Sequence, residues 1–560
     1  MLRFLPRLLP ILSLLVASAA AGQVQAPVLK WAHGGCYASW CETGWYSSPA
    51  VADLDGDGVA EVVASAYSIV ALDGATGALL WRVASGHDRS EPGASSEGRT
   101  WPGIAVADVD GDGESEIVTA HGAGWVSVYD AAGYFETGWP KRPVSSELRS
   151  LAVGDLDRDG TMEIAVGAAR GNATNAWVLE HTGATRPGWP QVAAGAPGYS
   201  WGVYADTIAL ANLDADPQLE LVVPSDVHYI CSYEPNGAHR SSSAVYGGDP
   251  WGEVGVWESY ATELRGWGMC NGVRAESYRT NFADGPASIA DLDGDGTPEI
   301  VATGRTYDCS GGTETTKYTG VHVLRPDRGR FVTASYDWTT VPVDLGAPLS
   351  LDYNVIESAS YYPALADLDG DGEKEILFSD FSGRLHAFWL DGTEHGDWPY
   401  AIWPGGGAFR YGSEPVVADL DADGHAEVLV ATWTRKGTGT SGPLLILDWA
   451  GNLLHAAPIP AALGSASWNG ALAAPTLAEI DGEPNFEVVV QTAHSGVVAW
   501  DLPGSRHARL LWGTGRGSFL RAGTAGPGWT LFADGFERGD ASRWSGLRAL
   551  RGREAERPSG

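Results

Sequence analysis

A nine-residue acidic pattern recurs eight times along the 560-residue chain and restricts its fold more than any other feature. In its complete form it reads D-x-D-x-D-G-x-x-E, as in "DLDGDGVAE" from Asp53 to Glu61, and each copy is called an acidic loop below. Repeats of this length predict a solenoid, a propeller or an array of small sheets. The eight copies, between 47 and 79 residues apart, begin at Asp53, Asp108, Asp155, Asn212, Asp291, Asp367, Asp419 and Glu479.

The residues around each acidic loop read as four short strands joined by tight turns. In the first unit the strands are "SSPAVADL", "EVVASAY", "SIVALDGATG" and "ALLWRV". Four strands in roughly fifty residues make one propeller blade. We therefore predict an all-β fold, an eight-bladed β-propeller of four-stranded blades over residues 28–515, with calcium loops in the first hairpin of each blade. An open array of separate sheets is the alternative.

The acidic loop has the composition of a calcium site. Carboxylates at the first, third and fifth positions of a tight turn converge, and glycine at the sixth position permits the sharp bend. Hard oxygen ligands in this number favour Ca²⁺ over zinc or copper. The loop is not an EF-hand, because the closing glutamate of that motif stands at the twelfth position, where this chain has Ala64. In the first unit the predicted ligands are Asp53, Asp55, Asp57, the Val59 carbonyl and Glu61.

Six loops keep the full pattern, which predicts about six calcium sites. In the other five, with the seventh-position residue acting through its backbone carbonyl, the predicted ligands are Asp108, Asp110, Asp112, Glu114, Glu116, Asp155, Asp157, Asp159, Thr161, Glu163, Asp291, Asp293, Asp295, Thr297, Glu299, Asp367, Asp369, Asp371, Glu373, Glu375, Asp419, Asp421, Asp423, His425 and Glu427. The fourth loop departs from the pattern at Asn212 and Pro217, and the eighth at Glu479 and Glu483, which leaves metal binding there open. Acidic turns that are merely hydrated are the alternative at every loop.

The charge balance agrees with cation binding. The chain has 36 basic and 70 acidic residues, a formal net charge of −34, and 31 of the acidic residues stand at ligand positions of the eight loops. Without these carboxylates the two signs nearly balance. Four carboxylates crowded together without a cation would raise one another's pKa. A chain this acidic also argues against nucleic acid as a partner.

The loops and their flanking strands resemble the FG-GAP or VCBS repeats of integrin-α-like β-propellers, and the resemblance covers most of the chain. It implies that each loop lies between the first and second strands of a blade and binds calcium structurally. It also implies an exported binding or adhesion module. Similar calcium-rich eight-bladed propellers occur among rhamnogalacturonan lyases, so a secreted polysaccharide lyase is the alternative function. A purely structural surface protein is a third.

The strand order indicates where a ligand would bind. Strands alternate in direction, so the acidic loops and the third-to-fourth turns share one face, and the longer, variable connections share the opposite face. Long loops on a rigid scaffold favour binding, so we expect a glycan or protein ligand on the opposite face. Within segment 242–284, four aromatic residues are candidates for stacking on sugar rings, with packing inside the segment as the alternative: Trp251, Trp257, Tyr260 and Trp267.

Two other patterns bear on structure and chemistry. The "GWP" triplets at Trp139 and Trp189 and the "DWP" triplet at Trp398 recur at one register, which favours packing between blades over ligand contact. The sequence contains no HExxH, P-loop or CxxC motif, so no catalytic residue is assigned.

The two ends of the chain predict export. Arg3 and Arg7 precede an apolar run and then small residues, which is typical of a signal peptide, here residues 1–21. The run is too short to span a bilayer, and we predict no transmembrane segment and a secreted or cell-surface location. Residues 516–530 read as a Gly-rich linker. The tail, residues 531–560, resembles a short C-terminal segment of exported proteins from Gram-negative bacteria.

Export makes disulfides possible among the five cysteines. Cys36 and Cys41 are close enough in sequence to pair. Cys270 and Cys309 fall on connections of the same face, and we predict that they pair. This leaves Cys231 as a thiol within a strand.

Overall fold

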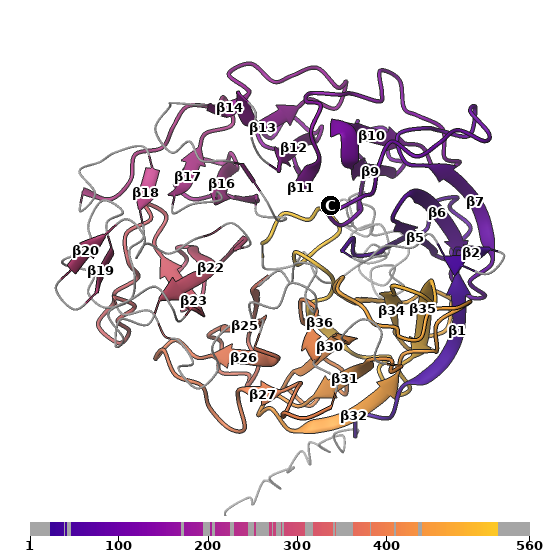
Figure 1. The fold of residues 1–560 in the computed structure, drawn as a ribbon. Helices are drawn as coiled ribbons and strands as arrows, with labels where there is room; N and C mark the ends of the chain where they lie inside the picture. Colours follow the sequence, from indigo (N-terminus) through magenta and orange to yellow (C-terminus); the bar gives the residue numbers. More distant parts are fainter. Residues whose placement is uncertain are drawn as a thin grey trace, which may run out of the picture.

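The computed structural model describes residues 23–37, 40–41, 46–169, 173–193, 202–203, 208–224, 229–244, 251–253, 268–270, 273–275, 282, 285–307, 317–339, 342, 362–380, 382–407, 410–434 and 439–524. Within these ranges the chain forms a ring of eight antiparallel blades (Figure 1), which confirms the predicted all-β propeller. The one helix in them is the three-residue 3₁₀ turn Gly122–Gly124. No helix of this part of the chain is long and apolar enough to cross a bilayer.

The blades follow the order of the acidic loops. Blades 1 to 4 comprise β4 (Ala50–Ala52), β5 (Glu61–Ser65), β6 (Ser68–Asp73) and β7 (Leu79–Ala84); β8 (Ala105–Ala107), β9 (Glu116–Ala120) and β10 (Val126–Tyr129); β11 (Leu148–Gly154), β12 (Glu163–Ala168), β13 (Thr174–Leu179) and β14 (Gln191–Ala193); and β15 (Ala209–Ala211), β16 (Glu220–Pro224), β17 (Tyr229–Tyr233) and β18 (Trp251–Glu253).

Blades 5 to 8 comprise β21 (Ala287–Ala290), β22 (Glu299–Tyr307) and β23 (Lys317–Leu324); β24 (Ala364–Ala366), β25 (Glu375–Ser379), β26 (Arg384–Phe388) and β27 (Tyr400–Ala401); β29 (Val416–Asp419), β30 (Glu427–Thr434), β31 (Pro443–Leu447) and β32 (Leu453–Pro458); and β33 (Thr476–Ala478), β34 (Glu487–Gln491), β35 (Val497–Asp501) and β1 (Val28–Gly34). Blade 7 also pairs with β28 (Arg410–Gly412) and β36 (Arg509–Trp512), and two small hairpins are formed by β2 (Cys36–Tyr37) with β3 (Trp40–Cys41) and by β19 (Gly268–Cys270) with β20 (Val273–Ala275).

Blades 2 and 5 have three strands in the described residues, where four were predicted. In blade 2 the fourth strand is reduced to two isolated pairings, of Tyr129 with Phe135 and of Val126 with Lys141. Lys141 stands next to Pro140 and two residues before Pro143, and proline has no N–H to extend a ladder. In blade 5 much of the chain after Thr339 lies outside the described ranges.

The middle strands are apolar at successive positions rather than at alternate positions because both of their faces are buried. Each blade packs between two neighbours, so its second strand has no face in water, and every residue of β5 and β9 is buried. The outer strand β7 instead alternates between buried and exposed residues. Burying a valine such as Val62 or Val63 stabilises the fold by about 1.5–3 kcal/mol.

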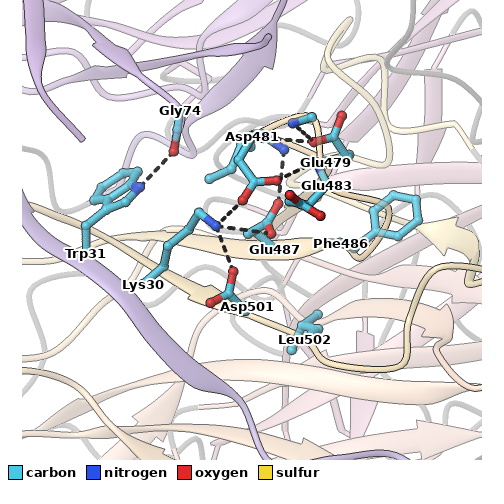
Figure 2. A network of polar contacts seen from close by, with 12 residues as sticks. Lys30, Trp31, Gly74, Glu479, Asp481, Glu483, Phe486, Glu487, Asp501 and Leu502 are labelled. Carbon is cyan, nitrogen blue, oxygen red and sulfur yellow. Dashed lines mark hydrogen bonds and ion pairs between the residues drawn. The ribbon is translucent and has the colours of Figure 1, made fainter. Parts of the chain in front are cut away.

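The ring closes by pairing the two ends of the propeller. β1, the first strand of the chain, lies antiparallel to β35 and is the outer strand of blade 8. Its buried Trp31 then reaches blade 1, where the indole N–H donates to the Gly74 carbonyl at 2.7 Å (Figure 2). The last blade is therefore complete only when the N-terminal strand is in place.

The same tryptophan contact joins other neighbouring blades. In each case a buried indole N–H donates to a carbonyl in the third-to-fourth turn of the next blade, at 2.9–3.0 Å. The pairs are Trp81 with Ala131, Trp139 with His181, Trp189 with Pro235, Trp338 with Leu390, and Trp398 with Trp449. The predicted packing role of Trp139, Trp189 and Trp398 is confirmed.

Residues 513–524 fill the centre of the ring (yellow in Figure 1). Their carbonyls accept hydrogen bonds from amides of the innermost strands: Leu477 donates to Gly513, Val106 to Phe519, Val153 to Leu520, Leu210 to Ala522 and Ile289 to Gly523, at 2.7–3.2 Å. These amides belong to five different blades. The described part of the segment expected to be a linker, residues 516–524, is thus packed against the propeller as a central segment.

Two buried arginines fasten the central segment. The Arg521 guanidinium donates to the carbonyls of Ile104, Pro49, Ser48 and Gly515 and to the Thr514 hydroxyl, at 2.7–3.3 Å. Arg516 donates to the carbonyls of Ile208 and Ala287 at 2.9 and 2.7 Å. Together the two side chains connect the segment to blades 1, 2, 4 and 5.

Replacing Arg521 with methionine should lower the free energy of unfolding by at least about 3 kcal/mol, because several buried carbonyls lose their donor. The measurement is urea unfolding followed by tryptophan fluorescence. Arg506→Met is the matched control, since Arg506 is exposed on a turn. Equal midpoints for the two variants would show that the central segment does not stabilise the ring.

Candidate metal centres and a candidate ligand surface

The acidic loops fold around their own carboxylates. In blade 1 the Asp53 carboxylate accepts hydrogen bonds from the amides of Gly56 and Gly58, at 2.8 and 3.1 Å. Asp55 accepts from the Asp57 amide at 3.1 Å, and Asp57 accepts from the Val59 amide at 2.8 Å. These bonds hold the turn around its own carboxylates, and oxygens of Asp53, Asp55 and Glu61 lie within 4.8 Å of one another.

Glycine at the sixth position is required by the backbone. Gly58 has φ +95° and Gly372 has φ +97°, in the left-handed region that side chains other than glycine rarely adopt. Their amides donate to the first aspartates of their loops, Asp53 and Asp367. In loops 4 and 8 the sixth residue is Pro217 or Pro484, which provides no N–H for this bond.

The six seventh-position residues follow the sixth-position glycine, two residues after the fifth aspartate. The amide of each donates to the carboxylate of that aspartate at 2.7–2.8 Å, which fixes the backbone at this point of the turn. The residues are Val59, Glu114, Thr161, Thr297, Glu373 and His425.

The glutamate at the ninth position is buried and hydrogen-bonded in the same way in all eight blades. Its Oε2 accepts the backbone N–H of the loop's second residue at 2.6–3.0 Å. The glutamates are Glu61, Glu116, Glu163, Glu220, Glu299, Glu375, Glu427 and Glu487, each no more than 7% exposed. This bond anchors the loop to the start of the second strand.

Burial makes the charge of these glutamates unfavourable. Burial, with a smaller contribution from the neighbouring aspartates, raises the pKa of Glu61 to about 7 and of Glu116 to about 8. The pKa of Glu375 rises to about 9 for the same reasons. The backbone N–H that each accepts acts in the opposite direction and does not outweigh them.

The carboxylates of the loops gather closely enough to hold a metal ion. Oxygen atoms lying within 4.8 Å of one another come from Asp53, Asp55 and Glu61; from Asp108, Asp110 and Asp112; from Asp155, Asp157 and Glu163; and from Asp291, Asp293 and Asp295. In blade 4 the group consists of Asp214, Asp216 and Glu220 of the loop together with Glu234, which follows the third strand. All-oxygen donor sets of this kind fit a hard divalent cation. Several acidic clusters of this chain can therefore bind metal.

The two incomplete loops differ in their internal bonds. In loop 4 the Asn212 side-chain amide donates to the Asp216 carbonyl, a contact that a carboxylate could not make. In loop 8 the Glu479 carboxylate accepts the amides of Asp481 and Gly482. Both loops keep the buried ninth glutamate, so the turn survives the loss of the sixth glycine.

The predicted aromatic ligand residues are only partly covered by the structure. Trp251 begins β18, whose backbone pairs with Cys231 of β17. Trp257, Tyr260 and Trp267 lie outside the described residues. Their role in ligand binding stays a prediction.

The cysteines are resolved in part. Cys36 and Cys41 form a disulfide across the β2–β3 hairpin, and Cys231 is a buried cysteine within β17 that is not disulfide-bonded, as expected. Cys309 lies outside the described residues, so its pairing with Cys270 stays a prediction.

A cluster of arginines and aromatic rings lies on the face opposite the acidic loops. Tyr46, Trp101 and Arg149 stand at the ends of innermost strands that are farthest from the loops, because β4, β8 and β11 each run toward their loop. Tyr46 stacks on Trp101 with ring centroids 3.9 Å apart. The guanidiniums of Arg99 and Arg149 lie 4.5 and 4.0 Å from the centroid of the Trp101 ring.

Glu147 fixes both arginines of this cluster. Its carboxylate accepts from Arg99 Nε at 3.2 Å and from Arg149 Nε at 2.9 Å. Trp101 is only 3% exposed, whereas the Arg99 side chain is 34% exposed. The cluster therefore presents a positioned, partly solvated guanidinium pair on a buried aromatic support, with one excess positive charge.

Sequence reasoning missed this cluster. Arg99 and Trp101 are separated from Glu147 and Arg149 by a whole blade, so only the ring brings them together. The available signal was the placement of "GRTW" shortly before one inner strand and of "ELR" at the start of the next, where the face opposite the loops begins.

Comparison with known families and structures agrees with this architecture. A family model described as FG-GAP-like repeat matches residues 367–430, and an FG-GAP repeat model matches residues 148–179. Together the matched segments contain the acidic loops of blades 3, 6 and 7. No curated protein sequence matches the chain.

Solved structures share the fold at low sequence identity. An exotype rhamnogalacturonan lyase, YesX, has a TM-score of 0.50 and 16% identity, over 89% of this chain and 80% of that one. The V. cholerae biofilm matrix protein Bap1 has a TM-score of 0.48 and 15% identity, over 86% and 92%. At 16% identity the likeness to YesX shows the propeller fold alone.

Eight blades, each with its acidic loop between the first two strands, define a repeat-built β-propeller. The chain is thus a β-propeller in which family models identify FG-GAP repeats at residues 148–179 and 367–430.

In buffer free of divalent ions, the protein should lose stability as the pH rises from about 5 to about 8. A glutamate such as Glu116 ionises near pH 4.5 when unfolded and near pH 8 when folded, so the native state binds the extra proton in this window. Glu116→Gln keeps the acceptor for the Val109 amide and should show a smaller loss. The measurement is the melting temperature across this pH range.

The exposed Glu114 of the same loop supplies the control for that experiment. Glu114→Gln should follow the wild-type curve, because Glu114 is in water. If Glu116→Gln also follows the wild-type curve, the buried carboxylate does not govern this pH dependence.

Proposed function

We propose that this chain is an exported β-propeller that binds calcium in its acidic loops and acts as a binding or adhesion module through its opposite face. The observation that carries the proposal is the Arg99–Trp101–Arg149 cluster on that face. Calcium has a structural role in this proposal, since the loops lie on the far side of the ring from the cluster.

The loop chemistry supports calcium. Each complete loop supplies four carboxylates and a turn with a backbone carbonyl at the seventh position, and Ca²⁺ takes six to eight oxygen ligands in flexible geometry. A bound divalent ion would compensate the buried charge of residues such as Glu61 and Glu375. Metal binding to the folded loops would then add to folding stability.

Two features of the chain, a disulfide and an apolar N-terminal run, support export. The Cys36–Cys41 disulfide agrees with an oxidising compartment. The apolar N-terminal run after Arg3 and Arg7 is typical of a signal peptide.

The cluster on the opposite face supports a glycan that carries carboxylates. Arg99 and Arg149 offer planar donors that match carboxylate geometry, and Glu147 neutralises only one of them. Tyr46 is partly exposed beside them and provides a ring that can stack on a sugar. Trp101 acts as their support rather than as a contact, because it is buried.

Removing calcium should lower the melting temperature of the wild-type protein. When free calcium is kept at one hundred times the dissociation constant of a site, that site contributes about 2.7 kcal/mol to stability. Several sites together therefore give a large shift in melting temperature. The experiment compares protein in excess EDTA with the same sample after calcium is restored. A melting temperature that does not change between the two would contradict structural calcium.

Loss of the paired guanidiniums should weaken binding of an acidic glycan. We expect Arg99→Gln combined with Arg149→Gln to reduce affinity for polygalacturonate at least about tenfold, because charge-assisted hydrogen bonds are lost. Dextran serves as the uncharged probe and should bind neither protein. Affinity is measured by isothermal titration calorimetry.

Arg89→Gln is the matched control, because Arg89 also lies over an aromatic ring, Tyr134, but contacts the third-to-fourth turn of blade 2 through the Ala132 carbonyl. Its affinity should equal that of the wild type. If the double variant keeps the affinity of the wild type, the ligand binds elsewhere. Binding to an acidic protein but to no glycan would identify a protein ligand. Release of an unsaturated product absorbing in the ultraviolet would instead indicate a polysaccharide lyase.

A further inference from the structure

Three of the eight acidic loops contain a basic side chain at the position where a metal ion's charge would act. In blade 3, Arg186 lies 2.6 Å from the Asp157 carboxylate and 3.1 Å from Glu163, the third and ninth residues of the loop. It also contacts Glu180, directly after the third strand, at 3.2 Å. One guanidinium therefore compensates three carboxylates of this blade.

Blade 4 repeats the arrangement with Arg240. Its guanidinium lies 2.8 Å from Asp214, 3.8 Å from Glu220 and 2.7 Å from Glu234. These residues stand at the third loop position, the ninth loop position and the first position after the third strand, as in blade 3. Arg186 and Arg240 also occupy the same register, because their amides donate to Val178 and Ser232 of the neighbouring strand.

Blade 8 takes its basic residue from the other end of the chain. Figure 2 shows Lys30 of β1 pointing into the loop, where its ammonium group contacts Asp481 and lies 3.7 Å from Glu487 and 2.8 Å from Asp501. Lys30 stands at the break in the pairing register between Leu29 and Trp31. In three blades, therefore, a basic residue lies among equivalent carboxylates. Lys30 belongs to the outer strand itself, and Arg186 and Arg240 belong to the segment that leads into it.

In the described parts of the other five blades, no lysine or arginine forms an ion pair with a carboxylate of the acidic loop. The residue in the equivalent register break is Leu80 in blade 1, between Leu79 and Trp81, and Leu454 in blade 7, between Leu453 and His455. The equivalents of Arg186 in blades 2 and 5 are Glu136 and Phe331, by the same backbone hydrogen bond.

In blade 6, His395 follows at the same spacing from the turn and contacts Asp391 rather than the loop. Among the described residues, no ion pair joins a lysine or arginine to the ninth glutamates of these five blades. Those glutamates are Glu61, Glu116, Glu299, Glu375 and Glu427.

We infer that blades 1, 2, 5, 6 and 7 bind calcium, whereas in blades 3, 4 and 8 the side chains of Arg186, Arg240 and Lys30 replace the ion. Blade 3 belongs to the second group although its loop keeps the complete sequence pattern. A guanidinium 2.6 Å from Asp157 and 3.1 Å from Glu163 places a positive charge beside the oxygens that a metal would need, and it repels a second positive charge. The inference rests on the calcium binding proposed above and specifies which loops perform it.

The test counts bound calcium ions per chain, by elemental analysis after equilibrium dialysis of the full-length protein. The wild type should bind five ions. Arg186→Gln should bind six, because the blade 3 loop is freed, and in EDTA it should melt below the wild type. Arg158→Gln is the matched control, since Arg158 is exposed in the same loop and donates to the Pro217 carbonyl, and it should bind five.

The converse variant is Leu80→Lys, which places the blade 8 arrangement in blade 1 on a side chain that is 51% exposed. It should bind four ions, and it tests the inference even if Arg186→Gln does not fold. Six ions in both the wild type and Arg186→Gln, or five in Leu80→Lys, would overturn the inference. A wild type that binds no calcium would overturn the calcium proposal itself, and the inference with it.

Discussion

A buried carboxylate at the ninth position of every acidic loop is the constraint on which the rest of this propeller depends. Its hydrogen bond to the second-position amide, as between Glu61 and Leu54, ties each loop to the start of the second strand. The bond needs an acceptor, and the site needs a cation, because ionised carboxylates are costly to bury alone. The strongly acidic composition therefore follows from the architecture of the hairpins rather than from a charged surface.

Two kinds of contact convert eight such hairpins into one rigid ring. Indole N–H groups such as that of Trp139 connect neighbouring blades at their outer edges, and the central segment connects the inner strands. Arg521 makes the second kind of contact effective, since its single planar group satisfies carbonyls from blades 1 and 2 at once.

The sequence predicted what local patterns determine. Blade number, loop geometry, the Cys36–Cys41 disulfide and the packing of Trp139 all follow from residues within one repeat or from the repeat itself. It did not predict the role of Lys30, which meets Asp481 only when the ring closes, or of Arg521, which lies in a Gly-rich stretch typical of linkers. Arg186 was equally hidden, because a complete loop pattern does not reveal a cation that approaches from the outer strand.

The short inner strands link the acidic loops on one face to the arginine cluster on the other. β8 has only three residues, about 10 Å of extended chain, between Asp108 of its loop and the segment that carries Trp101. Disorder in the blade 2 loop would therefore affect β8, the same strand that positions Trp101, the aromatic support of Arg99 and Arg149. Blade 3, which supplies Arg149, has its loop carboxylates compensated by Arg186, a charge that no chelator can remove. The arginine pair is consequently supported from one side by a blade with a permanent internal cation and from the other by a blade whose buried Glu116 has none.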